Sequence, residues 1–159
     1  MIQVRTKVVP NSKWAGYEVE PLGVIYKIVP FNFPAWISFK VSVPTLAVGN
    51  SVLLRPANST PLVGEVMSEI FSKAGIDHRI KIIHSSPADT DFIMAQPEVH
   101  GLSFTGSTAA SKLVAVSAAK NLKRSVIEAG GSDPFILFED ADIKRSVETT
   151  ILARLINAG

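Results

Sequence analysis

The chain has 159 residues, of which 47% are hydrophobic and 19% are charged. This length suits one domain with its own core, and this composition excludes a disordered chain. The 16 Lys and Arg against 14 Asp and Glu give a net charge of only +2, which does not indicate nucleic-acid or membrane binding. Because the sequence contains no cysteine, disulfides, thiolate metal sites and cysteine nucleophiles are excluded.

The sequence offers no targeting or membrane-spanning signal. Residues 1–13 lack the unbroken apolar core of a signal peptide. The most apolar stretch, residues 22–39, is interrupted by Lys27, Asn32 and two prolines, which argues against a transmembrane helix. We therefore expect a soluble, cytoplasmic protein that binds neither membranes nor nucleic acids.

Residues 1–20 differ in pattern from the rest of the chain. The breaker cluster Pro10-Asn11-Ser12 predicts that 1–20 form an irregular N-terminal arm. From residue 21 onward, apolar strand-like runs alternate with helical segments, so we expect residues 21–159 to form a single domain.

The first half of this alternation is punctuated by proline and glycine. Prolines bound a β-branched run, Gly49-Asn50 follows one helical segment and Gly75 follows another. The predicted elements are a strand at 22–29, a helix at 35–48 kinked at Pro44, a strand at 51–55, and a helix starting at Pro61 with Thr60 as its N-cap.

The second half continues the same alternation. Ser107 and Asp142 are predicted N-caps, and each precedes a helical segment. The predicted elements are strands at 80–84, 101–105, 125–128 and 135–138, and helices at 89–95, 108–120 and from 143 onward.

Alternating strands and helices with continuously apolar strands predict a mainly parallel sheet covered on both faces. The fold class is therefore α/β, a doubly wound, Rossmann-like single domain. In such sheets ligands bind beyond the carboxyl ends of the strands. The loops that follow the predicted strands, at 30–34, 55–60, 85–88, 105–107 and 128–134, are the candidate site.

Two of these loops carry a polar side chain directly after a strand. The amide of Asn32 can donate a hydrogen bond to an oxyanion, or it can simply stabilise a turn. Arg55 is placed to contact a phosphate or a ribose hydroxyl, although a lone arginine is more often solvated.

Two other loops carry the remaining candidates. Gly106 and Ser107 lead into a helix whose free amides can hold a pyrophosphate, yet Ser107 can equally act only as an N-cap. The dinucleotide fingerprint G-x-G-x-x-G is absent. Glu128 ends a predicted buried strand, where desolvation would suit a general base, or it is a surface acid before the flexible turn at Gly130.

No metal site is predicted. The three histidines, His78, His84 and His100, do not have the spacing of ligands on one helix, and the sequence contains no H-E-x-x-H motif.

Taken together, the loops form an ordered series: Pro-Phe-Asn-Phe-Pro at 30–34, Gly-Asn-Ser-Val-Leu-Leu-Arg-Pro at 49–56, Phe-Thr-Gly-Ser at 104–107 and Glu-Ala-Gly-Gly at 128–131. The closing Asn-Ala-Gly at 157–159 continues it. This series resembles the aldehyde dehydrogenase superfamily, and the sequence from Gly130 to Phe135 resembles its succinate-semialdehyde dehydrogenase-like subgroup.

The resemblance implies a role for each matched position. Asn32 matches the oxyanion-hole asparagine, Glu128 the glutamate that activates the deacylating water, and Arg55 a lysine that contacts the adenosine ribose or its 2′-phosphate. Because a guanidinium fork favours a phosphate, Arg55 favours NADP over NAD. The cofactor-binding set implied by the resemblance is Pro30, Phe31, Arg55, Ala57, Gly106, Ser107 and Gly130.

The sequence also departs from the family pattern. The family's catalytic cysteine would follow Gly159, and Ser111 stands where many members have glycine. The resemblance therefore implies a truncated paralogue, a nucleotide-cofactor-binding or vestigial module that is inactive as a dehydrogenase. The alternatives are a weak ester hydrolase using Asn32 and Glu128, and a structural, self-associating pseudoenzyme. The mean hydropathy of +0.27 favours a homo-oligomer.

Overall fold

The computed structural model describes residues 5–6, 10–11, 16–17 and 19–157. Contacts between Cα atoms divide the chain into two compact units, Met1–Ala129 and Gly130–Gly159, which are described separately. In the predicted N-terminal arm, β1 (Arg5–Thr6) pairs antiparallel with β2 (Gly16–Tyr17). The other arm residues, except 10–11 and 19–20, lie outside the described residues, as do the last two residues of the Asn-Ala-Gly segment.

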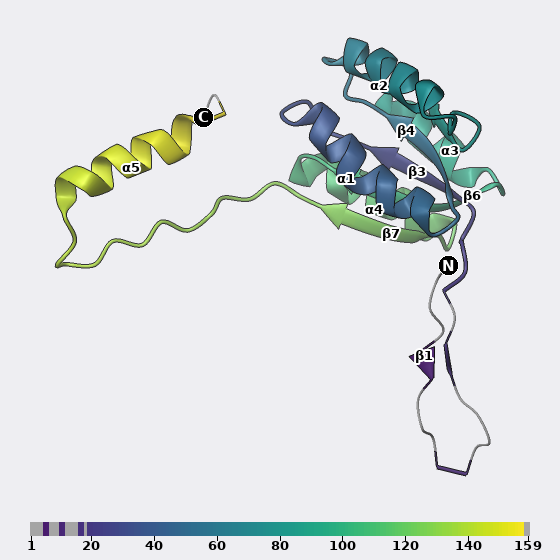
Figure 1. The fold of residues 1–159 in the computed structure, drawn as a ribbon, viewed down its shortest axis with the longest axis horizontal. Helices are drawn as coiled ribbons and strands as arrows, with labels where there is room; N and C mark the ends of the chain where they lie inside the picture. Colours follow the sequence, from purple (N-terminus) through teal and green to yellow (C-terminus); the bar gives the residue numbers. More distant parts are fainter. Residues whose placement is uncertain (1–4, 7–9, 12–15, 18, 158–159) are drawn as a thin grey trace. The chain divides into compact units, whose positions relative to one another are not determined.

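The first unit is built on a five-stranded sheet in which every strand pair is parallel (Figure 1). The strand order β5-β4-β3-β6-β7 places the first strand of the sheet at its centre, as in a doubly wound fold. This confirms the predicted α/β, Rossmann-like class. The strands are β3 (Val24–Ile28), β4 (Ser51–Arg55), β5 (Ile80–Ile82), β6 (Val99–Thr105) and β7 (Arg124–Glu128).

Helices cover both faces of this sheet, as the sequence predicts. On one face, Tyr26 and Leu102 form a core with residues of α3 (Thr90–Ala95) and α4 (Thr108–Lys120). On the other, Leu54 and its neighbours form a second core with residues of α1 (Pro34–Ala47) and α2 (Pro61–Lys73). The two cores exist because successive side chains of a strand point to opposite faces.

The helix starts follow the predicted signals with one exception. Prolines open α1 and α2, and Ser107 Oγ accepts a hydrogen bond from Ala110 N at 3.3 Å. Thr60 lies at the N-cap position of α2, but its side chain makes no cap bond. Its hydroxyl instead donates to the carbonyl of Ala57 at 3.3 Å, so the preceding turn uses the group that the prediction assigned to the helix.

Gly23 directly precedes the start of β3, and Gly49 lies in the turn that follows α1. Both have positive φ angles, of 122° and 96°, which favour glycine. The side chain of Asn50 accepts hydrogen bonds from Leu22 N at 2.7 Å and Gly23 N at 3.0 Å. These two hydrogen bonds fix the start of β3 relative to the start of β4.

The second unit contains α5 (Ile143–Leu155), whose N-cap Asp142 accepts a hydrogen bond from Arg145 N at 3.1 Å, as predicted. The predicted strand at 135–138 is wrong, because these residues are irregular. An apolar run becomes a strand only when a neighbouring strand completes its hydrogen bonds, and the described residues of this unit include no strand. No helix in the described part of the chain is long and apolar enough to cross a membrane.

Candidate functional site

The carboxyl ends of the strands meet at one edge of the sheet, where the sequence places the site. Ile28 lies beside Arg55 on β4 and beside Phe104 on β6. Thr105, in turn, lies beside Glu128 on β7. The predicted loops after β3, β4, β6 and β7 therefore start from neighbouring points.

A cavity of about 360 Å³ opens at this edge, on the face that α3 and α4 cover. Ile28 and Phe104 contribute to it from the sheet, and Leu113 and Val114 contribute from α4. Its lining is mostly apolar, with Arg55, Asp91 and Lys120 as the charged residues. A largely apolar pocket with few fixed polar groups is typical of a site for a small organic ligand or cofactor.

Arg55 is buried, with 7% of its surface exposed, so it is not the solvated arginine that was the alternative. Its Nε donates to the carbonyl of Ser85 at 2.8 Å, and its Nη2 donates to Asn58 Oδ1 at 3.0 Å. These bonds use two of the five N–H donors of a guanidinium and fix its plane. Arg55 is therefore a positioned cation that borders an apolar cavity.

Ser85 connects Arg55 to a buried tyrosine on the central strand. Tyr26 has no exposed surface, and its hydroxyl lies 3.5 Å from Ser85 Oγ. Burial raises the pKa of Tyr26, so the phenol stays neutral at physiological pH. In the residue after Ser85, the hydroxyl and the backbone N–H of Ser86 both donate to Asp89 and lower the pKa of that carboxyl.

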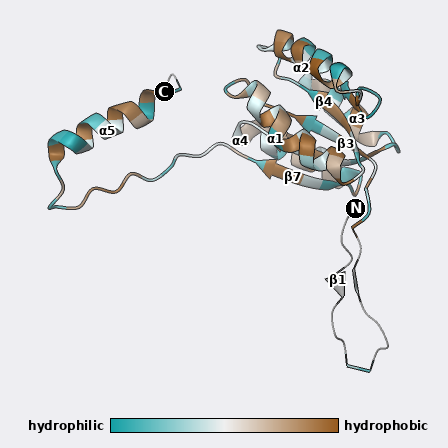
Figure 2. Ribbon diagram, viewed as in Figure 1, coloured by the Kyte–Doolittle hydropathy of each residue, from teal (hydrophilic) through white to brown (hydrophobic). Residues whose placement is uncertain are grey.

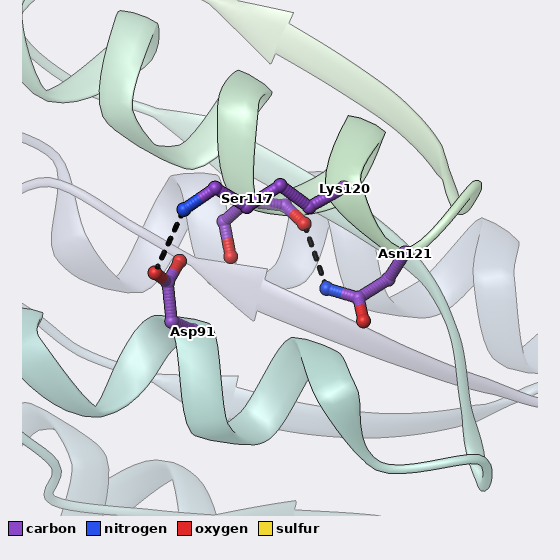
Figure 3. A network of polar contacts seen from close by, with 4 residues as sticks. All are labelled: Asp91, Ser117, Lys120 and Asn121. Atoms are coloured by element: carbon purple, nitrogen blue, oxygen red, sulfur yellow. Dashed lines mark hydrogen bonds and ion pairs between the residues drawn. The ribbon is translucent and has the colours of Figure 1, made fainter.

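Two oppositely charged residues, Asp91 of α3 and Lys120 of α4, also line the cavity, and Figure 3 shows their contact. Lys120 Nζ lies 3.4 Å from Asp91 Oδ2. The Ser117 hydroxyl, which faces this carboxylate without completing a hydrogen bond, and then Lys120 lower the pKa of Asp91. Sequence reasoning missed this pair, because the two residues come from different helices and no spacing within one segment relates them.

Gly106 and Ser107 make the turn from β6 into α4. Gly106 N donates to the carbonyl of Glu128 at 3.1 Å, which ties this turn to β7. A Cβ atom at Gly106 would lie 2.6 Å from Cζ of Phe104, so a side chain here would displace a residue of the cavity. Ser111 is buried, and its hydroxyl donates to the carbonyl of Ser107 at 2.9 Å.

The loop after β3 lies largely in solvent. Asn32 is exposed, and Phe31 has 67% of its surface exposed. Pro30 and, in the loop after β4, Ala57 are only partly exposed. These side chains lie at the carboxyl edge of the sheet, and their roles there stay predictions.

Glu128 does not have the surroundings that a desolvated general base needs. Its side chain is 58% exposed, and its Oε1 lies 3.9 Å from Nζ of Lys40 on α1. The expectation of a desolvated carboxylate is therefore wrong, because β7 is an edge strand of this sheet and its side chains are mostly exposed. Gly130 begins the second unit.

Two of the three histidines, His84 and His100, have structural contacts. His84 Nε2 lies 2.8 Å from Glu65 Oε1, and His100 Nδ1 accepts from Val24 N at 3.3 Å. Within the described ranges, no group of three or more potential ligands could hold a metal ion.

The parallel sheet defines a Rossmann-like domain, and the cavity at its carboxyl edge is the candidate site. The sequence profile of the Aldehyde dehydrogenase family matches residues 1–159. The chain belongs to the aldehyde dehydrogenase family.

The relatives are enzymes several times longer than this chain. This chain is 38% identical over 142 residues to a succinate semialdehyde dehydrogenase of Acinetobacter baylyi. The matched region covers 88% of this chain and 29% of that protein. Succinic semialdehyde dehydrogenase from Streptococcus pyogenes, solved with NADP+, is 31% identical with a TM-score of 0.91, covering 99% of this chain and 35% of that one. PnpE, solved with nicotinamide adenine dinucleotide, is 28% identical with a TM-score of 0.89, and the match covers 98% of this chain and 32% of the PnpE chain. The chain thus spans about a third of their length.

Proposed function

We propose that this chain is a nucleotide-cofactor-binding module of the aldehyde dehydrogenase type, and that it binds NADP(H) in preference to NAD(H). The observation that carries the proposal is the buried, hydrogen-bonded Arg55 beside an apolar cavity of about 360 Å³. A flat adenine ring suits the apolar space between α3 and α4. The guanidinium of Arg55 suits the adjoining ribose and its 2′-phosphate.

The neighbouring turn would hold the pyrophosphate. The first amides of α4 carry the positive end of the helix dipole, and Gly106 keeps the approach free of a side chain. Ser107 would contact the cofactor from the same turn, with Pro30, Phe31 and Ala57 as flanking contacts. The cofactor would supply hydride transfer when bound, and the residues of this chain would bind and orient it.

We further propose that these 159 residues do not carry out aldehyde oxidation, because they hold no cysteine to act as the thiolate nucleophile. Ester hydrolysis has less support, because its proposed base Glu128 is exposed and paired with Lys40. The function proposed for the chain is therefore cofactor binding, in the cytoplasm as the sequence predicts.

Self-association is a second proposal that one observation favours. In the second unit α5 has no buried residue, although it carries an apolar stripe that includes Val147, Ile151 and Leu155. Figure 2 shows hydrophobic segments along this helix. Exposed apolar surface of this kind is typical of an interface, so we expect a homo-oligomer. Light scattering tests this, and a monomer at every concentration would contradict it.

Calorimetric titration with NADPH and NADH tests the cofactor proposal. We expect NADPH to bind more tightly, and we expect Arg55→Met to weaken NADPH binding roughly 10- to 100-fold, since hydrogen bonds to charged groups contribute about 1.5–3 kcal/mol. The preference for NADPH should disappear in the same variant, because its source is the guanidinium.

Lys112→Met provides the matched control. Lys112 is an exposed cation on α4 that does not line the cavity. Equal losses in Arg55→Met and Lys112→Met would point to general charge attraction and contradict the assignment. The absence of heat for both cofactors at millimolar concentration would remove the proposal.

A further inference from the structure

A second cavity lies on the opposite face of the sheet from the 360 Å³ cavity beside Arg55. Its volume is about 500 Å³, and residues of α1, β3, β6 and β7 line it. Ile25, Val41, Val48 and Val126 give it mostly apolar walls. The cofactor proposal uses none of these residues, so the question is what this space can hold.

Lys27 is the unusual residue of this cavity. It lies in the central strand β3 with 4% of its surface exposed, and it borders the cavity. Within the part of the chain that the structure describes, its ammonium makes no hydrogen bond and no ion pair. Buried lysines are normally paired, because removing a charge from water is costly unless a partner compensates it.

Among the described residues of the first unit, no carboxylate lines this cavity to supply that partner. Its other charged residue is Arg124 of β7, a second cation. α1 contributes only uncharged side chains here, since Lys40 of that helix points to Glu128 at 3.9 Å. The neighbouring strands contribute Leu54 and Ser103 beside Lys27, and neither of them titrates.

We propose that this cavity binds a small organic carboxylate, whose anionic group pairs with Lys27 and whose hydrocarbon part fills the apolar walls, while Arg124 adds positive charge to the same lining. The ammonium of Lys27, with Arg124 in the same lining, selects a negative charge. The apolar walls select an anion with a hydrocarbon chain over an inorganic one, because burying apolar surface adds to binding. The site is independent of nucleotide binding, so either proposal can fail alone.

The protonation state of Lys27 gives the site a characteristic pH dependence. Burial lowers the pKa of Lys27 to about 8, so the amine is still mainly protonated at pH 7. The ligand binds the protonated form of Lys27. Between pH 7 and pH 9 the protonated fraction falls roughly tenfold, and the affinity should fall by a similar factor.

Titration with sodium butyrate at constant ionic strength, followed by NMR chemical shifts of the sheet amides, tests the proposal. Butyramide has the same shape without the charge, and phosphate has the charge without the hydrocarbon chain. We expect saturable binding of butyrate at pH 7, a roughly tenfold loss at pH 9, and much weaker binding of the two analogues.

Lys27→Met should weaken butyrate binding at least tenfold, whereas Lys81→Met, which removes an exposed lysine of β5, should leave it unchanged. Methionine preserves the bulk of Lys27 and removes a buried charge, so the variant is expected to fold. Unchanged binding in Lys27→Met, equal binding of butyramide or phosphate, or no saturation at millimolar butyrate would each overturn the proposal.

Discussion

Replacing Lys27 by methionine is expected to raise the free energy of unfolding at pH 7 by up to about 3 kcal/mol, as judged from 1.36 kcal/mol per pKa unit. Desolvation lowers the pKa of this lysine from 10.5 to about 8, so the folded protein disfavours its charged form. Methionine occupies a similar volume without that charge. Urea unfolding of the two proteins at pH 7 measures the difference, and equal midpoints would contradict it.

The pH dependence of stability follows from the same lysine. Between about pH 8 and pH 10.5 the unfolded chain binds a proton that the folded chain has released, so the wild-type stability rises with pH over this interval. Below pH 8 Lys27 is protonated in both the folded and the unfolded chain, so the full cost of burying its charge lowers the stability. Lys27→Met should lack this rise. Unfolding curves at pH 7, 8, 9 and 10 test it, and parallel trends in both proteins would refute the assignment.

Gly106→Ala is expected to destabilise the first unit by about 1–3 kcal/mol, the usual cost of overpacking, and to weaken cofactor binding as well. The new Cβ would lie 2.6 Å from Cζ of Phe104, which is itself buried and cannot move away freely. The ring would have to shift, and Phe104 borders the cavity in which we propose that the cofactor binds. Thermal unfolding and NADPH titration of the variant measure the two effects.

A double-mutant cycle separates this clash from a general loss of stability. Phe104→Leu removes the atoms that the new Cβ would meet, at the cost of some packing. If the clash causes the effect, the double variant should be more stable than the sum of the single losses predicts. Additive losses would contradict the explanation. Gly131→Ala is the control, because a Cβ there meets no atom within 4 Å.

Local signals were enough to predict most of the fold. Prolines at helix starts, N-caps at Ser107 and Asp142, and apolar strands gave the order of the elements, and their alternation gave a parallel sheet. The strand expected at 135–138 was wrong, because the run is apolar but has no strand partner among the described residues of its unit. Strand pairing depends on distant residues, which periodicity does not report.

The sequence predicted where the candidate site residues lie, but it predicted the burial of their side chains only in part. The edge of the sheet followed from topology, so Arg55, Gly106 and Ser107 lie where the sequence placed them. The burial of Arg55 and the exposure of Glu128 depend on which neighbours cover each strand, and a single sequence does not give this. Lys27 was missed altogether, because in the sequence it only interrupts an apolar run.

The position of β3 at the centre of the sheet has a consequence for biosynthesis. β3 precedes β6 in the chain by a long interval, since 76 positions separate Val24 from His100, which accepts its backbone N–H. In the nascent chain β3 can pair with β4 as soon as both strands have been made. At a synthesis rate of about 5–20 residues per second, the other edge of β3 stays unpaired for several more seconds, until β6 has been made. A pulse of trypsin or a chaperone trap applied to stalled ribosomes should therefore find this edge open until β6 has left the exit tunnel.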